Sequence, residues 1–135
     1  MSEIIYIAGT NERPSIYFDS SYQLRITGCS IPEDVWDVYG GVTMRILKLT
    51  EKTPGLLNCE FTLEYCNRSS LECILDIFKL IRIMKNNGWQ IQVKWYYQEF
   101  DEDMKEAGEV YSKILEHSFI LIENKDLITE DSFMS

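Results

Sequence analysis

Residues 63–71 read Leu63-Glu64-Tyr65-Cys66-Asn67-Arg68-Ser69-Ser70-Leu71 and decide the fold, because an alternating strand runs here into an amphipathic helix. Ser69 and Glu72 have the spacing of a capping box, in which the serine oxygen accepts a backbone N–H and the glutamate reaches back to the cap. A hydroxyl there lies at the positive end of the helix dipole. A phosphate added to it would change the local charge by about −1.5 to −2. The junction is therefore a candidate switch; the alternative is that Ser69 is an ordinary N-cap.

Two predicted strands alternate strictly between apolar and polar residues. In 57–65 the apolar face holds the odd-numbered residues from Leu57 to Tyr65, and in 90–97 it holds those from Ile91 to Tyr97. Period-two alternation gives each strand one buried face and one wet face, whereas strands of a sheet covered on both sides are apolar throughout. We therefore expect helices mainly on one face of the sheet.

The remaining elements complete an α/β chain with a small mixed sheet in the order β-β-β-α-β-α-β-α-β. A second Ser-x-x-Glu pattern, from Ser30 to Glu33, predicts the start of the first helix. Gly40-Gly41 within that helix indicates close packing or a kink. We expect two strand–helix–strand passages to be right-handed crossovers. The other predicted strands are 4–7, 15–18, 23–27 and 119–123, and the other predicted helices are 70–87 and 102–116.

Length and charge limit the classes of function. The 135 residues predict one domain over 1–123, followed by a flexible tail at 124–135. The net charge of −9 disfavours nucleic acid as a partner. The N-terminus has no secretory pattern, and the apolar segment 71–84 contains too many charges for membrane insertion. The four cysteines show no CxxC spacing, so we expect reduced thiols and a cytoplasmic location.

The sequence contains no pattern typical of an enzyme. It lacks the phosphate-binding, dinucleotide-binding and nucleophile-elbow motifs. The single histidine, His117, lies near a predicted helix end without metal-ligand spacing. The acidic group between Asp101 and Glu109 is interpreted as a solvated helix face rather than a metal site. We therefore expect no catalytic residue, metal or cofactor. An alternative function is binding of a small ligand on the open sheet face or beside Trp95 and Tyr97.

Several segments, taken together and in order, resemble the SiaC family of small bacterial regulatory phosphoproteins over about residues 4–123. They are 28–33 (GCSIPE), 63–70 (LEYCNRSS), 74–77 (ILDI), 93–97 (VKWYY), 101–104 (DEDM) and 106–109 (EAGE). The resemblance implies a STAS-like anti-sigma-factor-antagonist fold and a partner-switching cycle in biofilm control. In that cycle a protein kinase phosphorylates the domain, a PP2C-like phosphatase reverses this, and the unmodified form binds and activates a diguanylate cyclase.

The chain departs from the family at one residue of the switch. The family pattern at the junction is Asn-Thr-Ser-Ser with threonine as phosphoacceptor, and Arg68 stands at that position here. Ser69 or Ser70 has then become the acceptor, or the chain is permanently in its unmodified, partner-binding form, or Arg68 binds a phosphate or carboxylate of the partner. The predicted partner surface is Asn67, Arg68, Ser69, Ser70 and Leu71.

Overall fold

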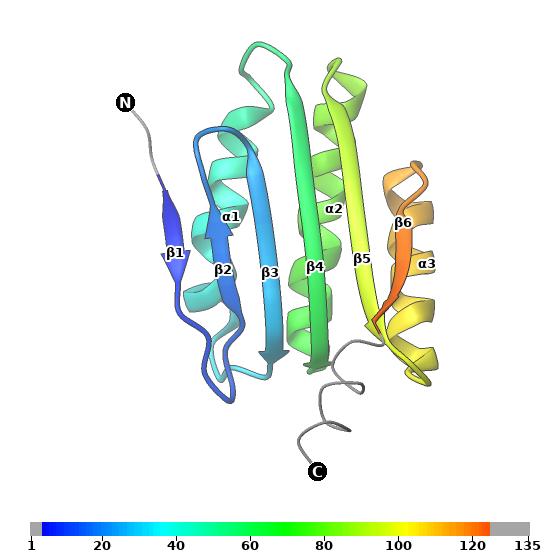
Figure 1. Cartoon of the computed structure of the whole chain (residues 1–135). Coiled ribbons are helices and arrows are strands. Elements are labelled where there is room, and N and C mark those ends of the chain that lie inside the picture. The colour runs from blue at the N-terminus through cyan, green and yellow to red at the C-terminus, as the bar shows by residue number, and fades with distance from the viewer. Residues whose placement is uncertain (1–3, 125–135) are drawn as a thin grey trace.

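Six strands form one sheet in the spatial order β1-β2-β3-β4-β5-β6 in the computed structural model, which describes residues 4–124 (Figure 1). The first two pairs of neighbours, β1–β2 and β2–β3, are antiparallel, and the other three pairs are parallel. The elements are β1 (Ile5–Ile7), β2 (Ser15–Phe18), β3 (Gln23–Ser30), α1 (Val35–Leu49), β4 (Leu56–Cys66), α2 (Arg68–Asn86), β5 (Gln90–Gln98), α3 (Glu102–Leu115) and β6 (Ile120–Asn124).

All three helices of residues 4–124 lie on the same face of this sheet, and no other element of that range covers the opposite face (Figure 1). The predicted mixed α/β sheet and its order of elements are thus confirmed. Three strand–helix–strand passages join parallel neighbours, not two, because α1 also connects a parallel pair, β3 and β4. The STAS likeness stays a prediction. Asn124 is the last residue of β6, and the rest of the predicted tail, 125–135, lies outside the described residues.

The core lies between the sheet and the helices. On β4 the side chains of Leu57, Cys59, Phe61 and Leu63 are buried, as the alternation predicts. Tyr65 was predicted to share that face, but 70% of its surface is exposed. The pairing shifts between Gly28 and Ser30 of β3, so that Leu63 faces Gly28 and Cys66 faces Ser30. The extra residue on β4 is a β-bulge, which reverses the alternation and turns Tyr65 outward.

Helix α1 begins at Val35, five residues after Ser30, which the sequence predicted as its first capping residue. Its N-cap is Asp34, whose side chain accepts hydrogen bonds from the backbone N–H groups of Trp36 and Asp37. The prediction that Ser30 opens this helix is wrong, because Ser30 ends β3 and is fully buried. Of the two explanations for Gly40-Gly41, close packing or a kink, close packing applies at Gly40, where a Cβ would lie 2.7 Å from the Trp36 ring, and not at Gly41, where the nearest atom would be 3.9 Å away.

No helix within residues 4–124 combines the length and the apolar composition that crossing a bilayer requires. This agrees with the sequence prediction for segment 71–84, which lies within α2. That helix carries charged side chains on its outer face and buries Ile74, Ile77 and Phe78 against the sheet. Most of its apolar side chains therefore pack into the core, while Leu71 and Leu75 stay partly exposed.

Candidate functional site at the strand–helix junction

Asn67 caps helix α2 and connects it to the neighbouring strand. Its backbone is extended, and its side-chain oxygen accepts a hydrogen bond from the Ser70 N–H at 2.9 Å. The Asn67 N–H donates to the Ser30 carbonyl at 3.0 Å, and its amide nitrogen donates to the Pro32 carbonyl at 3.4 Å. The predicted capping box of Ser69 and Glu72 is therefore wrong: the helix begins two residues earlier than that box requires.

Three buried hydroxyl groups form a chain on the inner side of the junction. The Ser30 hydroxyl donates to the Ser70 hydroxyl at 2.8 Å, and the Ser70 hydroxyl donates to the Ser30 carbonyl at 3.0 Å. Since Ser30 has then used its proton, the Tyr39 O–H, 2.5 Å away, is the donor to Ser30. All three residues are fully buried. Each hydroxyl proton has an acceptor, so the chain fastens α1 and α2 to the end of β3.

Burial at this end of the molecule disfavours charge. It raises the pKa of the Tyr39 hydroxyl far above its ordinary value, and it raises the pKa of the Cys66 thiol to about 12. Burial likewise raises the pKa of Tyr111, whose hydroxyl donates to the Leu71 carbonyl at 2.8 Å and so ties α3 to the first turn of α2. All four cysteines are free thiols, and the raised pKa keeps Cys66 neutral and poorly nucleophilic. The inner side of the junction is therefore structural.

Arg68 and Ser69 form the outer side of the junction. Both side chains are exposed, whereas Ser70 next to them is fully buried. Ser69 lies in the first turn of α2, where backbone N–H groups lack intrahelical partners. Neither Arg68 nor Ser69 forms a side-chain hydrogen bond or ion pair within residues 4–124. The structure thus separates the two serines of the predicted site, one accessible to a partner or kinase and one enclosed.

Two shallow hollows adjoin this outer side, and Leu71 lines both of them. One lies between α2 and α3 and is lined by Arg68, Leu71, Glu72, Leu75, Val110 and Tyr111. The other extends past the ends of β4 and the first turn of α3, and is lined by Glu64, Tyr65, Cys66, Leu71, Asp101, Asp103, Met104 and Ala107. Of the five predicted partner residues, Arg68 and Ser69 are exposed, Asn67 and Leu71 are partly exposed, and Ser70 is buried. Sequence reasoning missed the contribution of α3, because it follows α2 only after an intervening strand.

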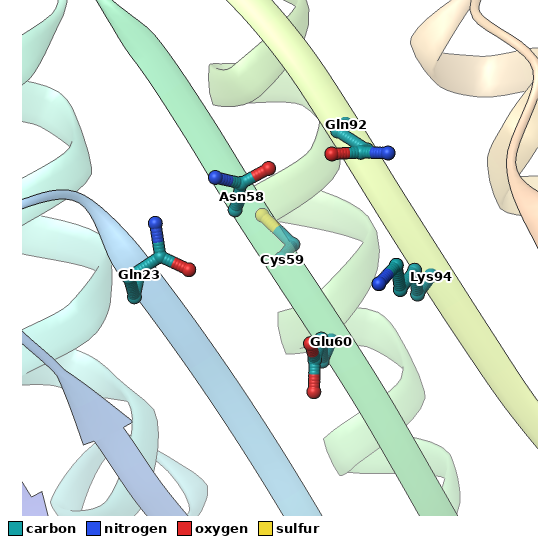
Figure 2. A pocket seen from close by; sticks show the side chains of 6 residues that line it. All are labelled: Gln23, Asn58, Cys59, Glu60, Gln92 and Lys94. Carbon is teal, nitrogen blue, oxygen red and sulfur yellow. The ribbon is translucent and has the colours of Figure 1, made fainter.

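The open face of the sheet carries a separate polar hollow. Figure 2 shows its lining on β3, β4 and β5: Gln23, Asn58, Cys59, Glu60, Gln92 and Lys94. Cys59 itself belongs to the core. The sequence also predicted, as an alternative, a groove beside Trp95 and Tyr97. Trp95 is fully buried and its indole N–H donates to the Met104 carbonyl at 2.9 Å, whereas Tyr97 lines a separate hollow with Thr62 and Tyr96. Gly108 packs against the Trp95 ring, since a Cβ there would lie 2.5 Å from it.

The structure groups no three metal-ligating side chains within residues 4–124 in a way that could hold an ion. Asp101 is the N-cap of α3 and accepts a hydrogen bond from the Met104 N–H at 3.1 Å, and Glu102 and Asp103 follow in the first turn of the helix. The backbone N–H of His117 donates to the Ser112 carbonyl as α3 ends. Of the acidic group, Asp101, Glu102 and Asp103 thus belong to the start of α3.

Comparisons with known proteins agree with one another. The profile of one family, described as SiaC family regulatory phosphoprotein, matches residues 7–124. An uncharacterised protein of Pseudomonas aeruginosa (strain UCBPP-PA14) is 26% identical over 108 residues, which is 79% of this chain and 86% of that protein.

Two solved structures share the fold. SiaC of Pseudomonas aeruginosa superposes with a TM-score of 0.78 at 23% identity, covering 90% of this chain and 99% of that one. A chain in the crystal structure of the diguanylate cyclase SiaD in complex with its activator SiaC, from the same organism, gives a TM-score of 0.82 at 24% identity, covering 89% and 99%. At this level of identity the likeness establishes the fold alone.

Proposed function

Because this chain belongs to the SiaC family of regulatory phosphoproteins, we propose that it is a non-enzymatic adaptor that binds and regulates a diguanylate cyclase through residues 67–71. Support comes from a structural neighbour, the SiaC of Pseudomonas aeruginosa, which is described as the activator of the diguanylate cyclase SiaD. The observation that carries the proposal is the outer side of the junction, where Arg68 and Ser69 are exposed on a rigidly held helix start.

Within this proposal Ser69 is the phosphoacceptor. Its hydroxyl is accessible, whereas a kinase would have to open the junction and break the hydroxyl chain to reach Ser70. A phosphate on Ser69 would lie in the first turn of α2, where the helix dipole favours negative charge. It would also place a bulky, strongly hydrated group on the partner surface, and removing its water on docking is costly. Phosphorylation therefore releases the partner.

The other members of the proposed cycle are a protein kinase and a PP2C-like phosphatase, acting in the cytoplasm. The test is the intact mass of the chain after co-expression with its cognate kinase, compared with Ser69→Ala and Ser70→Ala variants. We expect the wild type and Ser70→Ala to gain roughly 80 Da, one phosphoryl group, and Ser69→Ala to gain nothing. A mass gain that persists in Ser69→Ala would show that another residue is the phosphoacceptor.

A permanently unmodified form is the second candidate, and Arg68 favours it, because Arg68 cannot accept phosphate. In that case no variant but Arg68→Thr gains mass, while the wild type still captures the purified cyclase in a pull-down. The Arg68→Thr variant would then lose the cyclase when phosphorylated. If the wild type neither gains mass nor captures the cyclase, and a small acidic metabolite raises its melting temperature instead, the polar hollow of Figure 2 becomes the site to pursue.

A further inference from the structure

The two hollows are neighbours that share Leu71 in their linings, and we call them together the α2–α3 groove. We propose that the α2–α3 groove binds an amphipathic helix of the partner, one whose apolar face is flanked by lysine or arginine. The inference rests on the proposed function, since it names the kind of partner segment that the adaptor would recognise. It goes beyond residues 67–71, because half of the groove is built by α3.

The floor of the groove is apolar and firmly held. Leu71 and Leu75 contribute from α2, and Val110 and Tyr111 contribute from α3. Val110 is 49% exposed, a large fraction for an aliphatic side chain on a helix that packs against its neighbours. The hydrogen bond from the Tyr111 hydroxyl to the Leu71 carbonyl at 2.8 Å joins the two walls. A partner would therefore meet a preformed apolar surface.

The rim of the groove is acidic. Four carboxylates line it, from Glu64, Glu72, Asp101 and Asp103, against a single cation, Arg68. None of the four pairs with a lysine or arginine within the described residues. Asp101 accepts a hydrogen bond from the Met104 N–H and Glu64 accepts one from the Gln98 amide, but neither partner is a charged side chain. An acidic rim around an apolar floor is complementary to a segment that carries the opposite charge around an apolar face.

The dimensions fit a helix. Asp103 and Val110, both exposed, line the α3 side seven residues apart, which is about 10 Å along the helix at 1.5 Å per residue. A row of that length receives side chains at positions i, i+3 or i+4, and i+7 of a docked helix. A second copy of this chain is disfavoured as the occupant, because a two-fold interface would place the acidic rim against itself.

The test uses a synthetic probe, a helical peptide of about 15 residues with leucines on one face and lysines on the other. We expect the wild-type chain to bind this probe and to bind the same peptide with glutamate for lysine at least about tenfold more weakly. Affinities are measured by fluorescence anisotropy at physiological salt, so that only nearby charges contribute strongly.

Two pairs of variants locate the binding. Leu75→Asn should weaken the probe about tenfold, while Leu47→Asn, a matched change of an exposed leucine on α1, should leave it unchanged. Asp103→Asn should weaken it about threefold, and Glu102→Gln, in the same helical turn but outside the groove lining, should weaken it less.

Equal losses within either pair, or tight binding of the glutamate peptide, would overturn the groove proposal. Circular dichroism of each variant verifies that it is folded. The outcome is independent of the switch: a chain that gains no phosphate can still bind the probe through the groove. Conversely, a chain that ignores the probe can still be phosphorylated and bind a cyclase through another surface.

Discussion

The two sides of the strand–helix junction differ more than their sequence suggests. Ser69 and Ser70 are neighbours of the same residue type, yet the Ser69 side chain is exposed and the Ser70 hydroxyl is enclosed between Ser30 and the core. Successive residues of a helix point about 100° apart, so adjacent positions readily fall on opposite sides of a packed surface. The inner side holds the fold together, and the outer side is free to change.

This division separates stability from signalling. The inner side ties α2 to β3 and α1 through hydroxyl and amide hydrogen bonds, so that the outer side is presented in one fixed geometry. A modification on the outer side can alter the charge of the surface without disturbing those bonds. If the division holds, substitutions on the inner side should change the free energy of unfolding, and those on the outer side should change mainly partner binding.

The largest effect is expected for Ser70→Asp. A carboxylate at a fully buried position that now holds a hydroxyl would have no cation to pair with, and it would break the hydroxyl chain. Burial of an unpaired charge should lower the free energy of unfolding by about 3 kcal/mol or more. Urea denaturation measures this directly.

The control for that experiment is Ser70→Ala, which removes the hydroxyl without adding charge. It leaves the Ser30 proton without its acceptor and should cost about 1–2 kcal/mol. If Ser70→Asp were as stable as Ser70→Ala, the position would be open to solvent, and the inner and outer sides would not differ as described.

The sequence predicted the sheet better than it predicted the junction. Alternation at Phe61 and Leu63 depends on neighbours along the same strand, so it correctly predicted the buried face of β4. The exposed position of Tyr65 depends on a bulge, which exists because β3 and β4 change register after Gly28. That shift is a property of the pair of strands, and the sequence of one strand does not reveal it.

The helix start shows the same limit. Asn67 and Ser69 are both good N-cap residues, so local propensity does not choose between them. The choice is made by carbonyls of Ser30 and Pro32, which bind Asn67 from more than thirty residues away. Ser30 was likewise assigned to a helix start by its local pattern, while its role in the hydroxyl chain depends on Tyr39 and Ser70. Non-local contacts thus determined which serine is exposed.

The next largest effect is expected for Asn67→Ala. The substitution removes the cap of α2 and the hydrogen bond to the Pro32 carbonyl, and should lower the free energy of unfolding by about 1–2 kcal/mol. Asn67→Asp is the matched control, since it keeps a capping oxygen and should recover much of that loss. A cost in Ser69→Ala equal to that in Asn67→Ala would mean that Ser69 caps the helix after all.

A smaller effect is expected for Tyr39→Phe, which deletes only the far end of the hydroxyl chain. Ser30 keeps Ser70 as its acceptor and loses one donor, so the free energy of unfolding should fall by about 1 kcal/mol. Tyr17→Phe on the open sheet face is the control. Its hydroxyl donates to Asp19 at 3.0 Å without full burial and should cost less. If Tyr39→Phe and Tyr17→Phe lowered the free energy of unfolding equally, burial would not strengthen the hydrogen bonds of the hydroxyl chain.

The smallest effect on stability is expected for Ser69→Asp, on the outer side. The new carboxylate gains about 0.3–1 kcal/mol from the helix dipole, and repulsion from Glu72, one turn further along the helix, offsets about 0.2–0.5 kcal/mol of it. The free energy of unfolding should therefore change by less than about 1 kcal/mol, as measured by urea denaturation beside Ser69→Ala. The same variant should bind the cyclase more weakly in a pull-down, because the added charge lies on the partner surface. Unchanged cyclase binding at unchanged stability would remove Ser69 from that surface, whereas a large loss of stability would show that the outer side also holds the fold together.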